Sequence, residues 1–132
     1  LTNGTTSLGY TGTRFKDLYL SGVGYVGTIE EANTTLSGTT PSIDGDTAGS
    51  FTLTTSGNTT FTFAGVTSGR SVGFVLKITA GGTHTITWPS SVDWAGGTAP
   101  DAPASGETDV LVFYSVNGGT TWYGVLSIDA AA

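Results

Sequence analysis

The sequence predicts an all-β protein, and three observations support this class. Threonine is abundant, and its branched Cβ atom fits a pleated sheet better than a helix. Apolar and polar residues alternate with period two through much of the second half of the chain. No stretch carries apolar residues at i, i+3, i+4 and i+7 over three turns, so no amphipathic helix is expected. The 132 residues suffice for one compact domain and a short additional segment.

Residues 1–40 form the first part of the chain, in which short apolar stretches are separated by glycines. Strands of about four residues cannot build a core alone, so their side chains need partners from the downstream domain or from other copies of the chain. We predict that this shaft or linker segment joins three copies around a common axis. The residues expected at this trimer interface are Phe15, Leu18, Tyr19, Leu20, Tyr25 and Val26.

Residues 41–132 form the predicted C-terminal domain, and their alternation becomes regular near Ser50. Residues 51–54 and 59–63 predict two strands, which the intervening Ser-Gly-Asn turn is expected to join as a hairpin. Residues 71–79 predict a strand with four apolar side chains on one face. Residues 83–88 predict another strand, which ends at a proline because proline cannot donate to a ladder.

Residues 89–108 are rich in Pro, Gly, Ser and Ala, and they predict a long loop without secondary structure of its own. The continuous apolar run over residues 109–116 predicts a strand that is covered on both faces. Asn117-Gly118-Gly119 predicts a tight turn into the last strand, residues 121–128. About six strands with turns at this spacing predict a β-sandwich, jelly-roll-like in its arrangement.

The composition excludes several classes of partner. The formal net charge is −6, and the basic residues are Arg14, Lys16, Arg70 and Lys77. No nucleic-acid partner is expected, because neutralising phosphates requires clustered Lys and Arg side chains. Cysteine is absent and no apolar run is long enough to span a membrane, so we expect no thiolate metal site and no membrane insertion. Methionine is also absent, so the chain is expected to be part of a longer polypeptide or a processed product.

Several motifs resemble those of bacteriophage tail fibres. Residues 14–22, Arg-Phe-Lys-Asp-Leu-Tyr-Leu-Ser-Gly, are similar to the segment that links stalk and tip in such fibres. Residues 60–63, 85–89, 94–100, 109–111 and 118–124 are similar to their small C-terminal domains. The resemblance implies a virion location, homotrimeric assembly, contacts with other virion tail proteins and a role in host attachment. It implies no particular receptor and no shared binding residues.

Enzymatic activity is not expected, and no cofactor is predicted. His84 is the only histidine, it lies in a strand pattern, and no Gly-x-Ser-x-Gly motif accompanies it for a Ser-His-Asp site. Glu30 and Glu31 are adjacent and would point to opposite faces of a strand. Glu107 and Asp109 do share strand parity, as a pair of glycosidase carboxylates would require, but a solvated loop edge is the preferred interpretation.

A metal site is also not predicted. Asp44-Gly45-Asp46 contains the first acidic positions of a calcium loop, but the further ligands and the closing glutamate are absent at the required offsets. A turn is therefore the preferred interpretation of this triplet.

Four aromatic residues are the candidate ligand contacts: Trp88, Trp94, Trp122 and Tyr123. Aromatic faces stack on the apolar faces of sugars, and exposed rings mark recognition surfaces. Strand parity favours the core for Trp88 and Trp122, whereas Trp94 lies in the predicted loop. The leading hypothesis is a trimeric, non-enzymatic tail-fibre tip that binds a host-surface glycan. The alternatives are a virion adaptor or collar domain that docks other virion proteins, and a monomeric bacterial carbohydrate-binding module.

Overall fold

The computed structural model describes residues 12, 18 and 20–131, and the all-β class is confirmed for this part of the chain. Its regular structure consists of strands and one short 3₁₀ turn, η1 (Ala95–Gly97). The strands are β1 (Asn33–Thr35), β2 (Ser42–Asp44), β3 (Ser50–Thr54), β4 (Thr59–Thr60), β5 (Thr62–Ala64), β6 (Val72–Thr79), β7 (Ile86–Thr87), β8 (Val92–Trp94), β9 (Thr108–Ser115) and β10 (Trp122–Ala131).

The strands form one large sheet and two small sheets. The large sheet has six strands in the order β1-β3-β6-β9-β10-β8, and the small sheets pair β2 with β5 and β4 with β7. Only the β6–β9 and β9–β10 pairs are antiparallel, and the other pairs are parallel. This mixed pairing differs from the antiparallel pairing of a jelly roll.

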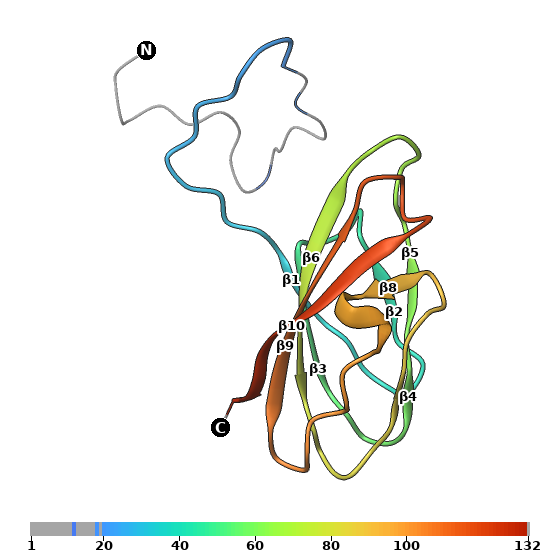
Figure 1. The fold of residues 1–132 in the computed structure, drawn as a ribbon. Helices are drawn as coiled ribbons and strands as arrows, with labels where there is room; N and C mark the ends of the chain where they lie inside the picture. The colour runs from blue at the N-terminus through green and yellow to red at the C-terminus, as the bar shows by residue number, and fades with distance from the viewer. Residues whose placement is uncertain (1–11, 13–17, 19, 132) are drawn as a thin grey trace.

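The parallel pairs arise because the chain winds in successive turns. β1 and β2 in the first turn lie beside β3 and β5 in the second, and β3 and β4 lie beside β6 and β7 in the third. Each turn thus contributes one strand to the large sheet, and the small sheets receive one strand from the first turn, two from the second and one from the third. Figure 1 shows this separation, with β2, β4 and β5 on one side of the body and β1, β3 and β9 on the other.

The hairpin predicted for residues 51–63 is wrong. β3 pairs with β1 and β6, whereas β4 pairs with β7 and β5 pairs with β2. The Ser56-Gly57-Asn58 segment therefore carries the chain from the large sheet to the small ones. Period-two alternation identifies the apolar face of each strand, but it does not say which strand lies beside it.

One apolar core lies between the large sheet and the small sheets. Its buried members come from six parts of the chain: Ile43, Phe51, Leu53, Phe61, Phe74, Leu76, Ile78, Leu111, Phe113 and Trp122. The predicted inward face of residues 71–79 is confirmed, because the side chains of Phe74, Leu76 and Ile78 are buried. Each fully buried side chain of this size contributes about 1.5–3 kcal/mol relative to an exposed one.

The predicted strands and turn at residues 109–128 are confirmed as an antiparallel hairpin of β9 and β10. Gly118 and Gly119 adopt φ angles of 67° and 78°, which the turn between these strands requires and which other residues rarely adopt. The predicted absence of structure in residues 89–108 is wrong. β8 and η1 lie in this stretch, and β8 pairs in parallel with β10, with Trp94 opposite Gly124.

Gly124 gives the ring of Trp94 its place against the sheet. A Cβ atom at position 124 would lie 2.9 Å from Cζ3 of Trp94 and 3.0 Å from Cε1 of Phe113. Both rings are packed against other aromatic side chains, so neither can move away freely. The absence of a side chain at this buried position therefore determines where the Trp94 ring lies.

We expect the substitution Gly124→Ala to lower the free energy of unfolding by about 1–3 kcal/mol, because the added methyl group overpacks a closed aromatic contact. Urea unfolding followed by tryptophan fluorescence measures this change. Gly27→Ala is the matched control, because a Cβ atom at position 27 has no neighbour within 4 Å. Equal unfolding free energies for the two variants would contradict this account of Gly124.

Candidate functional site

Trp122 and Trp88 both pack against the core. Trp122 is 1% exposed, and its ring lies 5.4 Å from that of Phe63 and 5.1 Å from that of Phe74. Its burial removes it from the candidate ligand contacts. Trp88 is half-buried and stacks on Phe61 with ring centroids 5.0 Å apart. Strand parity indicated both of these positions, because Trp88 shares its face with the half-buried Ile86 and Trp122 shares its face with the buried Gly124.

The other two candidates, Trp94 and Tyr123, lie on opposite faces of the six-stranded sheet. The ring of Trp94 packs on the inner face against those of Trp88 and Phe113, whereas Tyr123 is exposed on the outer face. The parallel register of β8 and β10 sets Asp93 beside Tyr123 and Trp94 beside Gly124. A hollow of about 370 Å³ opens here. Its lining consists of Asp93, Trp94, Ala95, Val112, Tyr114, Tyr123, Gly124 and Val125.

Tyr114 is the aromatic wall that the sequence did not suggest. It is the direct cross-strand partner of Tyr123, and the two side chains are 47% and 51% exposed. On its other side Tyr114 faces Gly73 in β6, where a Cβ atom would lie 3.3 Å from the tyrosine Cδ2. The ring of Tyr114 thus lies beside a residue without a side chain. The turn at residues 117–119 was the available signal, because its length determines which residues pair across the hairpin.

The expectation that the strand over residues 109–116 is covered on both faces is wrong within this chain. Phe113 is fully buried on the inner face, but Val112 is 36% exposed on the outer face. Val112 is also the centre of an apolar row, with Val75 of β6 on one side and Val125 of β10 on the other. An apolar sequence predicts that a face can be covered, but it does not show that the same chain covers it.

Asp93 carries the only formal charge among the residues that line the hollow. Within residues 20–131 the basic side chains are those of Arg70 and Lys77, and neither lines this site. Lys77 lies on β6 with Val110 as its partner, one row beyond Val75. The hollow is therefore an apolar and aromatic surface with a negative charge at its rim.

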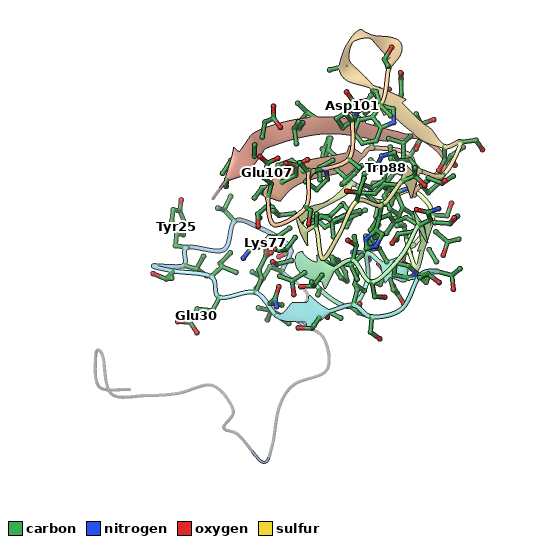
Figure 2. The ribbon with its side chains drawn as sticks, turned by 90° about the horizontal axis from the view of Figure 1, so that it is seen from below. Tyr25, Glu30, Lys77, Trp88, Asp101 and Glu107 are labelled. Carbon is green, nitrogen blue, oxygen red and sulfur yellow. The ribbon has the colours of Figure 1, made fainter. Side chains whose placement is uncertain are left out.

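The segment before β1 is a second exposed surface. Figure 1 shows the described part of this segment running away from the strands, and in Figure 2 Tyr25 lies apart from the densely packed side chains around Trp88. Its large apolar side chains are mostly exposed: Leu18 72%, Leu20 58%, Val23 77%, Tyr25 94%, Val26 66% and Ile29 71%. Phe15 and Tyr19, which were also predicted at the trimer interface, lie outside the described residues. The paired strands begin at β1, which lies within the predicted 1–40 segment.

His84, one of the residues weighed for catalysis, has a structural partner. Nδ1 of His84 lies 2.9 Å from Oγ1 of the buried Thr55 and shares a hydrogen bond with it. Across residues 20–131, no three His, Cys, Asp or Glu side chains lie close enough together to hold a metal ion. In the same range, no helix is long and apolar enough to cross a membrane.

Asp109 is buried, contrary to the expected solvated loop edge, and its Oδ1 accepts a hydrogen bond of 3.0 Å from the backbone N–H of Ala130. Burial raises the pKa of Asp109 above its ordinary value of 3.8, and the neighbouring Asp129 and Glu107 carboxylates raise it further, while the Ala130 hydrogen bond opposes them. The carboxyl group thus tethers the end of β10 to the start of β9.

Comparison with protein-family models, curated proteins and solved structures found no match to this chain.

We expect Asp109→Asn to reduce the pH dependence of stability. Because the pKa of Asp109 is higher in the folded state, its contribution to stability is full below pH 3.8 and is lost as the pH rises through the folded-state pKa. Asn keeps an oxygen acceptor for the Ala130 N–H but cannot ionise. Urea unfolding should therefore show that the wild type loses stability relative to the variant between pH 3.8 and neutral pH.

The exposed carboxylate of Asp101 provides the matched control for this experiment. Asp101→Asn removes the same charge without removing a buried carboxyl group, so its stability should follow that of the wild type. A difference between wild type and Asp109→Asn that stays constant with pH would contradict the assigned direction of the pKa shift.

Proposed function

We propose that the chain is a structural component of a bacteriophage tail fibre, in which three copies form a tip domain that attaches the virion to the host surface. The observation that carries this proposal is the exposed apolar segment before β1. Its side chains have no cover within the described residues, because the core of the domain is closed by its own sheets. The similarity of residues 14–22 to the linking segment of tail fibres points to the same assembly.

The energetics favour association of this segment with other copies of the chain. Apolar surface removed from water contributes roughly 25 cal/mol per Å². The six residues predicted at the interface would then contribute on the order of 10 kcal/mol per chain before the entropy of ordering is subtracted. Three copies around one axis would bury these side chains together.

We infer that the body of the tip is a β-sandwich-like unit. The six-stranded sheet supplies one layer, and the two small sheets supply the other. This interpretation is supported by the core, whose buried side chains come from β3, β6, β9 and β10 on one side and from β2 and the β4–β5 region on the other.

Attachment by such a tip would rest on avidity. Each chain presents one hollow lined by Tyr114 and Tyr123, and three copies on one axis would present three. Linked weak sites gain effective concentration without any new contact, provided that the target carries repeated groups. No catalytic step is part of this proposal.

A monomeric bacterial carbohydrate-binding module is the second candidate function, and one observation favours it. The hollow is formed within a single chain, because β8, η1, β9 and β10 supply its lining residues. Assembly is thus not required to build the site. The two candidates therefore differ in oligomeric state.

We expect light scattering on the purified chain to give about three times the monomer mass of 13.3 kDa. A double substitution of Tyr25 and Val26 to serine should shift the mass toward that of the monomer, because it removes two exposed apolar side chains from the predicted interface. Ile128→Ser is the control, because this residue is 48% exposed on β10 and is not among the residues predicted at the interface. A monomeric wild type would contradict the tail-fibre proposal and favour the monomeric module.

A further inference from the structure

We infer that the hollow on the outer face of the large sheet binds an organic ammonium group displayed on the host surface. This inference rests on the proposed attachment function and identifies the chemistry that the attachment site recognises. An amino sugar and a choline-type head group both carry such a group, so the shared chemistry is a substituted ammonium ion.

The walls of the hollow supply the attraction for a cation. Tyr114 and Tyr123 line it as direct neighbours on adjacent strands, while Trp94 borders it and keeps its ring on the inner face of the sheet. The face of an aromatic ring attracts an ammonium ion through the negative potential of its π-system. Several rings around one apolar hollow are the arrangement by which proteins recognise alkylated ammonium groups.

The charge at the site determines which ligand charge is favoured. Asp93 places a carboxylate in the lining, and neither Arg70 nor Lys77 reaches it. A ligand with its own carboxylate or phosphate at this point would meet a negative rim on a chain of net charge −6. An ammonium group instead gains an ion partner in Asp93, which favours cationic ligands over neutral and anionic ones.

The floor of the hollow selects the substituents on the nitrogen. Val112 and Val125 form it, and they offer no hydrogen-bond partner through their side chains. A bare metal ion or an unsubstituted ammonium ion would lose its hydration shell there without replacement. Methyl groups or ring carbons attached to the nitrogen would instead bury apolar surface against these valines.

The hollow is held in shape by the fold. The hairpin register pairs Tyr114 with Tyr123, and the Trp94 ring packs 5.2 Å from that of Trp88 and 5.6 Å from that of Phe113. Its volume of about 370 Å³ lies at the lower end of the range for small-molecule sites. When the walls of a site are already ordered, less binding free energy is lost to reorganisation of the site.

The test titrates the full chain with choline, glucosamine and N-acetylglucosamine, followed by calorimetry and tryptophan fluorescence. Choline represents a head group and glucosamine an amino sugar, while N-acetylglucosamine has the same ring as glucosamine without the charge. We expect at least one of the two ammonium compounds to bind with a Kd on the order of 1 mM. N-acetylglucosamine should bind at least about fivefold more weakly.

Three variants test whether the ammonium compounds bind in the hollow. Asp93→Asn should weaken ammonium binding about fivefold through the lost charge, and Tyr123→Ala should weaken it by a similar factor through the lost ring. Tyr123→Phe should restore most of the affinity, because it keeps the aromatic face. Asp101→Asn is the control, because it removes an exposed carboxylate that does not line the hollow.

Two results would overturn the inference. One is equal binding of N-acetylglucosamine and glucosamine with no effect of Asp93→Asn, which would indicate stacking of a neutral sugar. The other is no binding of either ammonium compound by a chain whose circular dichroism shows folded β-structure. Light scattering on the same samples tests the proposed function separately. A monomer that binds an ammonium compound would contradict the trimeric tip. A trimer that binds neither ammonium compound would contradict the ammonium site.

Discussion

The packing of Phe63 against three aromatic rings joins the small sheets to the large one. Its ring meets those of Phe74, Phe113 and Trp122 edge-on, at 5.2, 5.1 and 5.4 Å. Strands β4, β5 and β7 have only two or three residues each, so their ladders contain few hydrogen bonds. Such strands are stable because they share a core with a larger sheet. The packing of Phe63 thus holds β5, in the second turn of the chain, against the large sheet.

The one-sided core has a consequence for the opposite face of the sheet. Aromatic side chains fill the inner face around Phe113, and the outer face of the same strand keeps Val112 and Tyr114 with no layer above them. Gly73 shapes this outer face, because Tyr114 lies against it, whereas Gly124 shapes the inner face, because the rings of Trp94 and Phe113 lie against it. Strands β9 and β10 therefore carry core contacts on one face and the lining of the hollow on the other.

The two exposed apolar surfaces, the segment before β1 and the hollow, are suited to different kinds of contact. The segment before β1 is extended and carries separate apolar side chains, an arrangement suited to contacts with other chains. The hollow has ordered walls and a single carboxylate, an arrangement suited to a small ligand group. The low content of charged residues, 11%, leaves both surfaces largely free of competing charge. Proposals for assembly and for attachment thus rest on different residues and can fail independently.

The sequence by itself determined the β class, the inward face of β6, and the turn at Gly118 and Gly119, because local alternation and backbone conformation specify these features. It also identified Trp94 and Tyr123 as candidate contacts, but it did not bring them together and did not indicate Tyr114 or Asp93. Only the tertiary structure decided the parallel winding, the place of β8 beside β10 and the open outer face. Strand partners are chosen by burial across residues far apart in the chain, and period-two alternation carries no information about that choice.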